Sequence, residues 1–285
     1  MSNKNEKEFS VKRATRVNIG YHILLILIAL IMVVPFIWTL STSLKGQNEA
    51  VFSFPPQFIP GHPTFGNYAV VWNTLPIGRF LINSLILAVF GVALPVVLCS
   101  MAAFPLARMN FRGKNFVFMI IMGTMMIPGE VTMIPVYLII NKLGLMGNYA
   151  GIILPAAVPA MSIFLMRQGL LGIPKEMEES AIIDGAKVWQ IFLHIMLPMV
   201  KPTLATMSIL NFIGAWNNFL WPLLILEDPN TYPLTLGLYK LQGTFVANTR
   251  MIAAGAIIAL VPILAVFIFF QKYFIAAAYS SVIKG

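Results

Sequence analysis

The sequence has little charge. Only 10% of its 285 residues are Asp, Glu, Lys or Arg, whereas 59% are hydrophobic and the mean hydropathy is +0.84. A soluble domain of ordinary composition carries about 25% charged residues, because it needs them to cover its surface. The composition therefore excludes a soluble globular protein and predicts a membrane protein.

Groups that carry chemistry are also scarce. The single cysteine, Cys99, excludes an intrachain disulfide and is most simply a small apolar residue. The three histidines lie in separate segments and have no metal-ligand spacing. No nucleophile–base arrangement and no G-x-x-x-x-G-K-[ST] loop is found, so we predict neither an enzyme nor a chain that binds ATP, a metal or another cofactor itself. Any energy for its function must come from a partner.

Long apolar runs are abundant. A membrane-spanning helix needs about 20 apolar residues, and the sequence offers six candidates. The third candidate is interrupted by Pro128, Gly129 and Glu130, and Glu130 either faces a subunit interface or faces a transport pathway. No internal repeat of the kind found in many secondary transporters is evident, so we predict one domain over 1–285. The predicted spans are 19–40, 80–104, 116–140, 149–170, 203–226 and 251–273.

The distribution of Lys and Arg predicts how these spans are oriented. Cytoplasmic loops carry an excess of these residues. With the N-terminus inside, 14 of the 19 basic residues fall in inner segments and 5 in outer ones, so both termini are predicted to be cytoplasmic. The net charge of +9 mostly reflects this bias and not nucleic-acid binding, because the basic residues are dispersed.

A polar interruption at 172–201 separates two apolar runs. Acidic residues from Glu176 onward favour a helix N-terminus, and Asp184-Gly185 favours a turn. A second helix-compatible run from Ala186 follows. The pattern predicts a cytoplasmic helix–turn–helix at the membrane surface. An ordinary amphipathic pair of surface helices would satisfy the same pattern.

This segment also carries a spaced motif. Glu179-Ser180-Ala181 is followed after three residues by Gly185 and, after nine more, by Ile195-Met196-Leu197-Pro198. The motif resembles the cytoplasmic E-A-A loop of importer-type ABC permeases, with Ser180 in place of the first Ala. The resemblance implies that this loop couples the chain to an ATPase, through Glu178, Glu179, Ser180, Ala181, Asp184, Gly185, Ile195 and Pro198.

Strings at 126–145, 216–223, 232–238 and 282–285 extend the resemblance to carbohydrate-uptake permeases of the maltose-transporter type, in particular their six-span partner. The resemblance implies a type I ABC importer permease fold and a multi-pass protein of a bacterial-type inner membrane that helps to import a sugar or sugar derivative. It implies four kinds of partner: a second homologous permease, two ATPase subunits that hold ATP and Mg, an extracytoplasmic sugar-binding protein and the lipid bilayer.

Two further sets of residues are candidates. Trp216, Asn217, Asn218 and Trp221 suit a pathway for a neutral polyol, since amides bond hydroxyls and indole faces cover sugar rings; amide bonding between helices and interfacial Trp anchoring are the alternative. The resemblance also implies that the tail residues Val282, Ile283 and Lys284 contact the ATPases, and a solvated end is the alternative.

Other functions remain open at this point. An ABC permease for another solute, such as a polyamine or a phosphonate, would share the coupling motif. A self-contained secondary transporter would need a coupling-ion site, for which the predicted spans offer one carboxylate. The sequence does not identify the sugar.

Overall fold

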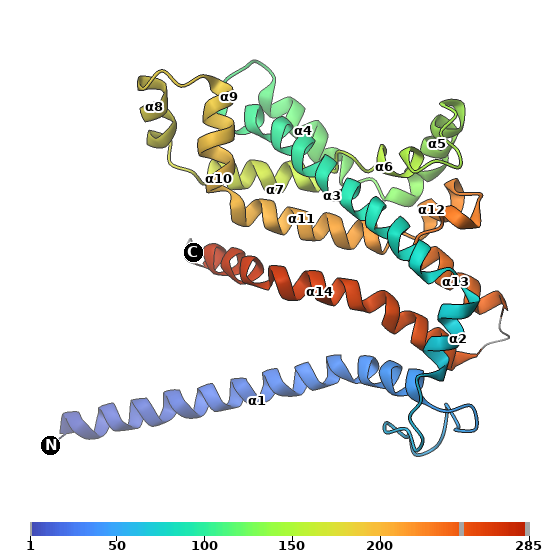
Figure 1. The fold of residues 1–285 in the computed structure, drawn as a ribbon. Coiled ribbons are helices and arrows are strands. Elements are labelled where there is room, and N and C mark those ends of the chain that lie inside the picture. Colours follow the sequence, from blue (N-terminus) through green and yellow to red (C-terminus); the bar gives the residue numbers. More distant parts are fainter. Residues whose placement is uncertain (1, 245–247, 283–285) are drawn as a thin grey trace. The chain divides into compact units, whose positions relative to one another are not determined.

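A computed structural model of the chain describes residues 2–244 and 248–282, and over these residues it is helical without a β-strand (Figure 1). The prediction of an all-α membrane protein is confirmed. The described chain forms two compact units, residues 2–74 with 248–258, and residues 75–244 with 259–282. The single domain over 1–285 stays a prediction.

The smaller unit is built on α1 (Ser2–Leu44), α2 (Gly66–Thr74) and the first residues of α14 (Thr249–Val282). In the candidate span Gly20–Leu44 of α1, none of the residues 20–40 is buried, whereas Ser41, Thr42 and Ser43 near its end are buried. The end of α1 is tied to α2, because Asn67 Nδ2 donates to the carbonyl oxygens of Ser43 (2.8 Å) and Lys45 (2.9 Å). The hydroxyls of Ser43 and Tyr68 lie 2.7 Å apart.

The larger unit is organised around α3 (Ile77–Arg108), which packs against α7 (Ala160–Leu171) and α11 (Lys201–Trp216) (Figure 1). The contact between α3 and α11 is close, since a Cβ added at Gly91 would lie 2.8 Å from the Cβ of Ala215. A side chain at Gly91 would force the two helices apart. The remaining elements are α4 (Lys114–Thr124), α5 (Gly129–Lys142), α6 (Ala150–Ile153), α8 (Glu176–Ile183), α9 (Val188–Gln190), the π-helix η1 (Ile191–Met196), α10 (Leu197–Met199), α12 (Leu220–Ile225), the 3₁₀ helix η2 (Pro229–Thr231) and α13 (Leu234–Thr244).

Each predicted span overlaps at least one helix, but among the described residues only three helices are long and apolar enough to cross a membrane unbroken: Gly20–Leu44, Ile77–Arg108 and Thr249–Gln271. The third span is a pair, Lys114–Thr124 and Gly129–Lys142, bent by 98°. The interruption seen in the sequence at Pro128 and Gly129 is therefore a real break. The count of six and the cytoplasmic termini stay predictions.

The spans predicted at 149–170 and 203–226 are not continuous helices. The first is split between α6 and α7 by a segment that contains Pro155 and Pro159, and the second is split between α11 and α12. Proline lacks an N–H and clashes with the carbonyl four residues earlier. For Pro222 that carbonyl is Asn218, whose oxygen accepts instead from Thr235 Oγ1 at 3.0 Å. The helix therefore breaks beside Asn218.

The predicted ATPase-contacting tail lies almost wholly outside the described residues. Val282 is the last residue of α14, and Ile283 and Lys284 are not described. Their role stays a prediction.

Candidate functional site

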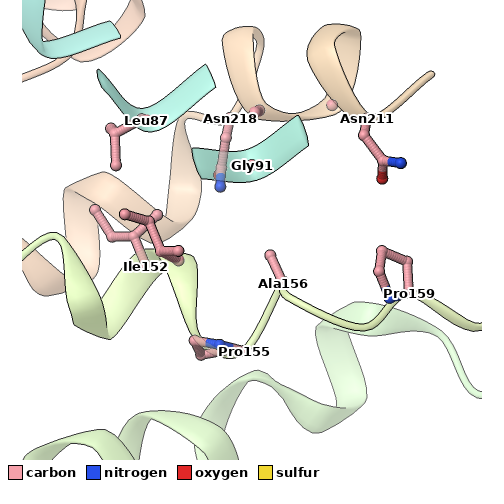
Figure 2. Close-up of a pocket in the computed structure, with 11 residues that line it drawn as sticks. Leu87, Gly91, Ile152, Pro155, Ala156, Pro159, Asn211 and Asn218 are labelled. Carbon is pink, nitrogen blue, oxygen red and sulfur yellow. The ribbon is translucent and has the colours of Figure 1, made fainter. Parts of the chain in front are cut away.

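The two helix breaks and α3 enclose a cavity of about 290 Å³. Figure 2 shows Asn211 and Asn218, from α11 and the segment after it, opposite Pro155, Ala156 and Pro159 of the break between α6 and α7. Both backbone breaks therefore line a hollow, and irregular backbone at membrane depth is tolerated where it lines a cavity. The lining is completed by Leu87, Gly91, Ile152, Ile153, Gly214 and Ala215.

The polar side chains of this cavity are two amides, and none of its lining residues is ionisable. Asn211 Nδ2 donates to Ser162 Oγ at 3.0 Å and to the Met207 carbonyl at 2.8 Å, which fixes its orientation. The side-chain amide of Asn218 has no hydrogen-bond partner among the described residues. Asn218 therefore presents a donor and an acceptor to the cavity.

A second cavity of about 300 Å³ adjoins the first and shares Pro155, Ala156 and Asn218 with it. Trp221 lies in its wall, together with residues of α5. An aromatic face next to a free amide is an arrangement that suits a sugar ring. The other lining residues are Gly129, Thr132, Met133, Val136 and Leu220.

The structure separates the four residues predicted for the pathway. Asn218 and Trp221 line these cavities. Trp216 lines neither cavity; it is 1% exposed, and its Nε1 donates to the Ala259 carbonyl at 3.2 Å, the packing role weighed as the alternative. Asn217 is exposed at the end of α11 and lines neither cavity.

The sequence reasoning missed Asn211 and Gly91 as cavity residues. Asn211 stands one turn or more before the conspicuous Trp-Asn-Asn run, and a polar residue at membrane depth was the available signal. Nothing in the sequence around Gly91 indicates that it lines a cavity, since this depends on how α3 and α11 are aligned in the fold.

Replacing Asn218 with alanine is expected to raise the KM for transport by about tenfold, the loss of roughly one hydrogen bond to a solute. Asn217→Ala is the matched control, because Asn217 is the preceding residue on the chain and lines neither cavity. The measurement is initial uptake as a function of solute concentration in proteoliposomes. Equal kinetics for the two variants would remove Asn218 from the pathway.

The predicted coupling segment consists of α8, a turn, and the helical run Val188–Met199. The helix α8 ends in a Schellman motif: the Gly185 N–H donates to the Ile182 carbonyl (3.0 Å) and the Ala186 N–H to the Ala181 carbonyl (2.9 Å). Gly185 has φ +80°, the left-handed conformation that the motif needs and that glycine adopts without strain.

The predicted coupling residues divide between an inner and an outer face. Ala181 is buried and Ile195 packs against the same apolar core, while Glu178 is half-buried. Ser180 Oγ donates to the Glu176 carbonyl at 2.7 Å, a bond within α8. The exposed members, which remain available to another protein, are Glu179, Ser180, Asp184, Gly185 and Pro198.

Around the exposed members lies an apolar surface. Ile183 is 85% exposed, Ile182 57%, Val188 56% and Trp189 55%. Exposed apolar side chains grouped in this way mark a surface for contact with another protein or with the membrane. We call Ile182, Ile183, Val188 and Trp189, together with Gly185, the coupling surface.

One buried cation positions this surface. Arg108, at the end of α3, has a side chain 5% exposed, and its Nη2 donates to the carbonyl oxygens of Leu170 (2.6 Å) and Ile173 (2.5 Å) at the end of α7. Its Nη1 lies 3.8 Å from Glu178 of α8. Arg108 thus joins α3, α7 and α8, a role that the sequence reasoning missed by counting it only as an inner basic residue.

The chain was compared with known proteins. Residues 96–278 match the family described as binding-protein-dependent transport system inner membrane component. The arabinooligosaccharides transport system permease protein AraQ of Bacillus subtilis is 34% identical over 284 residues, 99% of each chain. The diacetylchitobiose uptake system permease protein NgcG of Streptomyces coelicolor is 32% identical over 255 residues, 88% of this chain and 84% of the relative.

Among solved structures, a similar chain occurs in the crystal structure of a bacterial ABC transporter involved in the import of the acidic polysaccharide alginate. The TM-score is 0.77 and the sequences are 28% identical, with 90% of this chain and 96% of the other covered. The two chains therefore share a similar fold over nearly the whole of their length.

Proposed function

The chain belongs to the family of binding-protein-dependent transport system inner membrane components, and we propose that it is one of two pore-forming subunits of an ABC importer for a neutral oligosaccharide. As a member of this family it is a multi-pass membrane permease that works with a substrate-binding protein, and ATP hydrolysis lies in separate subunits. The relatives that transport arabinooligosaccharides and diacetylchitobiose support a sugar as the substrate.

The observation that carries the proposal is the uncharged cavity with a free amide at Asn218. A neutral sugar presents hydroxyl groups that both donate to and accept from an amide, and apolar ring faces that pack on Leu87, Ile152 or Trp221. A pocket with apolar walls and a few placed polar groups is typical of small-molecule sites.

The same observation disfavours the alternative solutes. A polyamine carries positive charges and a phosphonate carries negative ones, and either charge would lose its hydration in this cavity. Moving an unpaired charge out of water is costly, and the residues lining the two cavities supply no opposite charge. A neutral substrate is therefore favoured.

The remaining partners are part of the proposal. A second, homologous permease would close the pathway on the open side of the cavities. Two ATPase subunits, which hold ATP and Mg, would contact the coupling surfaces of the two permeases. The exposed apolar side chains of the coupling surface support this contact, because they are the kind of residue that a docking site buries.

The test is uptake by the assembled complex in proteoliposomes, with its binding protein outside and ATP inside. We expect uptake of a labelled neutral oligosaccharide that depends on both ATP and the binding protein, and no competition by spermidine or an alkylphosphonate. Competition by either charged solute at the concentrations that saturate sugar uptake would contradict the assignment to a neutral substrate.

A further inference from the structure

The loop between α1 and α2 presents large apolar side chains to its surroundings. No residue from 50 to 61 is charged. Phe52 is 77% exposed, Phe54 100% and Ile59 85%. Scattered exposed apolar residues are ordinary. Several of them in one short loop indicate a surface that contacts another protein or a membrane.

The loop is nevertheless held in a defined conformation. The Glu49 carboxylate accepts from the backbone N–H groups of His62 (2.8 Å), Gly61 (3.1 Å) and Gly46 (3.4 Å), which closes the base of the loop. The His62 bond is the largest cause of a lowered pKa of Glu49, so this carboxyl stays ionised to lower pH than usual. The Arg250 guanidinium donates to the Glu49 backbone carbonyl.

A buried lysine supports the same loop. Lys45 is fully buried, and its Nζ donates to the carbonyl oxygens of Ala50 (3.3 Å) and Val51 (3.4 Å). The apolar side chains that follow are therefore displayed outward from a fixed backbone. Their exposure is a built feature of the loop and not the result of a loose chain.

The loop also folds back onto the apolar part of α1. The rings of Phe58 and Trp38 are in edge-to-face contact with centroids 5.3 Å apart, and Trp38 lies within the apolar window Gly20–Leu44. On the same helix, Phe36 is 54% exposed and Leu40 45%. The apolar surface of the loop is thus continuous with a helix in which residues 20–40 are exposed or half-buried.

We propose that residues 52–59 lie in the membrane interface at the end of α1, with Phe52, Phe54 and Ile59 inserted among the lipids. Aromatic side chains are enriched at this depth, where they are partly apolar and partly hydrated. The occupant is a lipid surface, because the loop is in contact with the exposed apolar helix α1 and because residues 50–61 carry no charge that would lose its hydration among lipids. The inference does not depend on which solute is transported.

Single-cysteine labelling tests this placement directly. Cys99 is buried and is the only native cysteine, so a Cys99→Ser background gives one labelled site per variant. Nitroxides at Phe52→Cys and Ile59→Cys would be measured in the assembled complex, reconstituted in vesicles of phosphatidylethanolamine and phosphatidylglycerol. The readout is the collision rate with oxygen, which concentrates in lipid, against that with a water-soluble nickel chelate.

Two sites on the same unit calibrate the measurement. Ile31→Cys reports lipid, since Ile31 is 72% exposed within the span, and Asn48→Cys reports water, since Asn48 is polar and exposed just before the loop. We expect positions 52 and 59 to resemble position 31, with high oxygen and low nickel accessibility. Values that match position 48 overturn the proposal. So does shielding that develops only after the purified binding protein is added, which would assign the surface to that protein.

Discussion

Replacement of Gly185 by aspartate is expected to reduce the rate of ATP-driven transport at least tenfold, while the chain still inserts and folds. A tenfold reduction corresponds to a free-energy difference of about 1.4 kcal/mol. Gly185 has φ +80°, and no atom lies within 4 Å of a Cβ added there. Within the chain the only cost is therefore backbone strain, about 1–2 kcal/mol. The open space around Gly185 belongs to the coupling surface, where a new charged side chain would meet the ATPase. Uptake and ATP hydrolysis by the reconstituted complex measure the effect.

A second glycine provides the control. Gly113 has φ +84° and also has no atom within 4 Å of an added Cβ, but it precedes α4 and lies outside the coupling surface. Gly113→Asp should carry the same backbone strain and leave transport nearly unchanged. In contrast, Gly185→Asn, which tolerates the left-handed conformation better, should still impair coupling. If the two aspartate variants lose activity equally, backbone strain explains the loss and the docking role of Gly185 is wrong.

Replacement of Arg108 by glutamine is expected to uncouple ATP hydrolysis from transport and to destabilise the larger unit. The variant leaves the Leu170 and Ile173 carbonyls without their cationic donor and Glu178 without its partner. Loss of hydrogen bonds to a buried charged group costs about 2–4 kcal/mol. Because Arg108 links α8 to α3, we expect transport to fall further than ATP hydrolysis, so that more ATP is consumed per solute imported.

The ratio of ATP hydrolysed to solute transported distinguishes two roles of Arg108. A role in positioning α8 changes this ratio, whereas a role in stability alone does not. Arg167→Gln is the matched control. Arg167 is another arginine of the larger unit; its Nε donates to the Leu106 carbonyl (3.1 Å) and its guanidinium lies over the Phe118 ring, and among the described residues it has no hydrogen bond or ion pair to α8. Arg108→Lys keeps the charge but loses the planar guanidinium group. Its ratio of ATP hydrolysed to solute transported should lie between those of the unchanged protein and Arg108→Gln. An unchanged ratio in Arg108→Gln, with only less protein recovered, would limit Arg108 to a structural role.

The positions of the apolar segments could be predicted from the sequence, because hydrophobic runs of spanning length have few alternatives. Their continuity could not. The prolines at 155, 159 and 222 were visible, but a proline in a spanning helix produces either a kink or a break. Which of these occurs depends on whether a neighbour satisfies the freed carbonyl, as Thr235 does for Asn218.

Only those features of the candidate site that depend on local sequence could be predicted. The turn at Gly185 follows from local backbone chemistry and could be recognised. The distinction between Asn217 and Asn218 depends on which way the chain points after α11 ends, and the role of Arg108 depends on the arrangement of α3, α7 and α8. These are tertiary facts that spacing in one sequence does not contain.

The central claim is that the coupling surface docks on an ATPase subunit, and site-specific crosslinking tests it most directly. In the Cys99→Ser background, Ile183→Cys places a thiol on a residue 85% exposed at the end of α8. With a short bifunctional thiol reagent and cysteines introduced on the ATPase, we expect a crosslinked permease–ATPase product whose yield changes when ATP is added. Ile134→Cys, 71% exposed on α5, should give none. Equal yields from positions 183 and 134, or no product from position 183 in a complex that transports, would contradict the account.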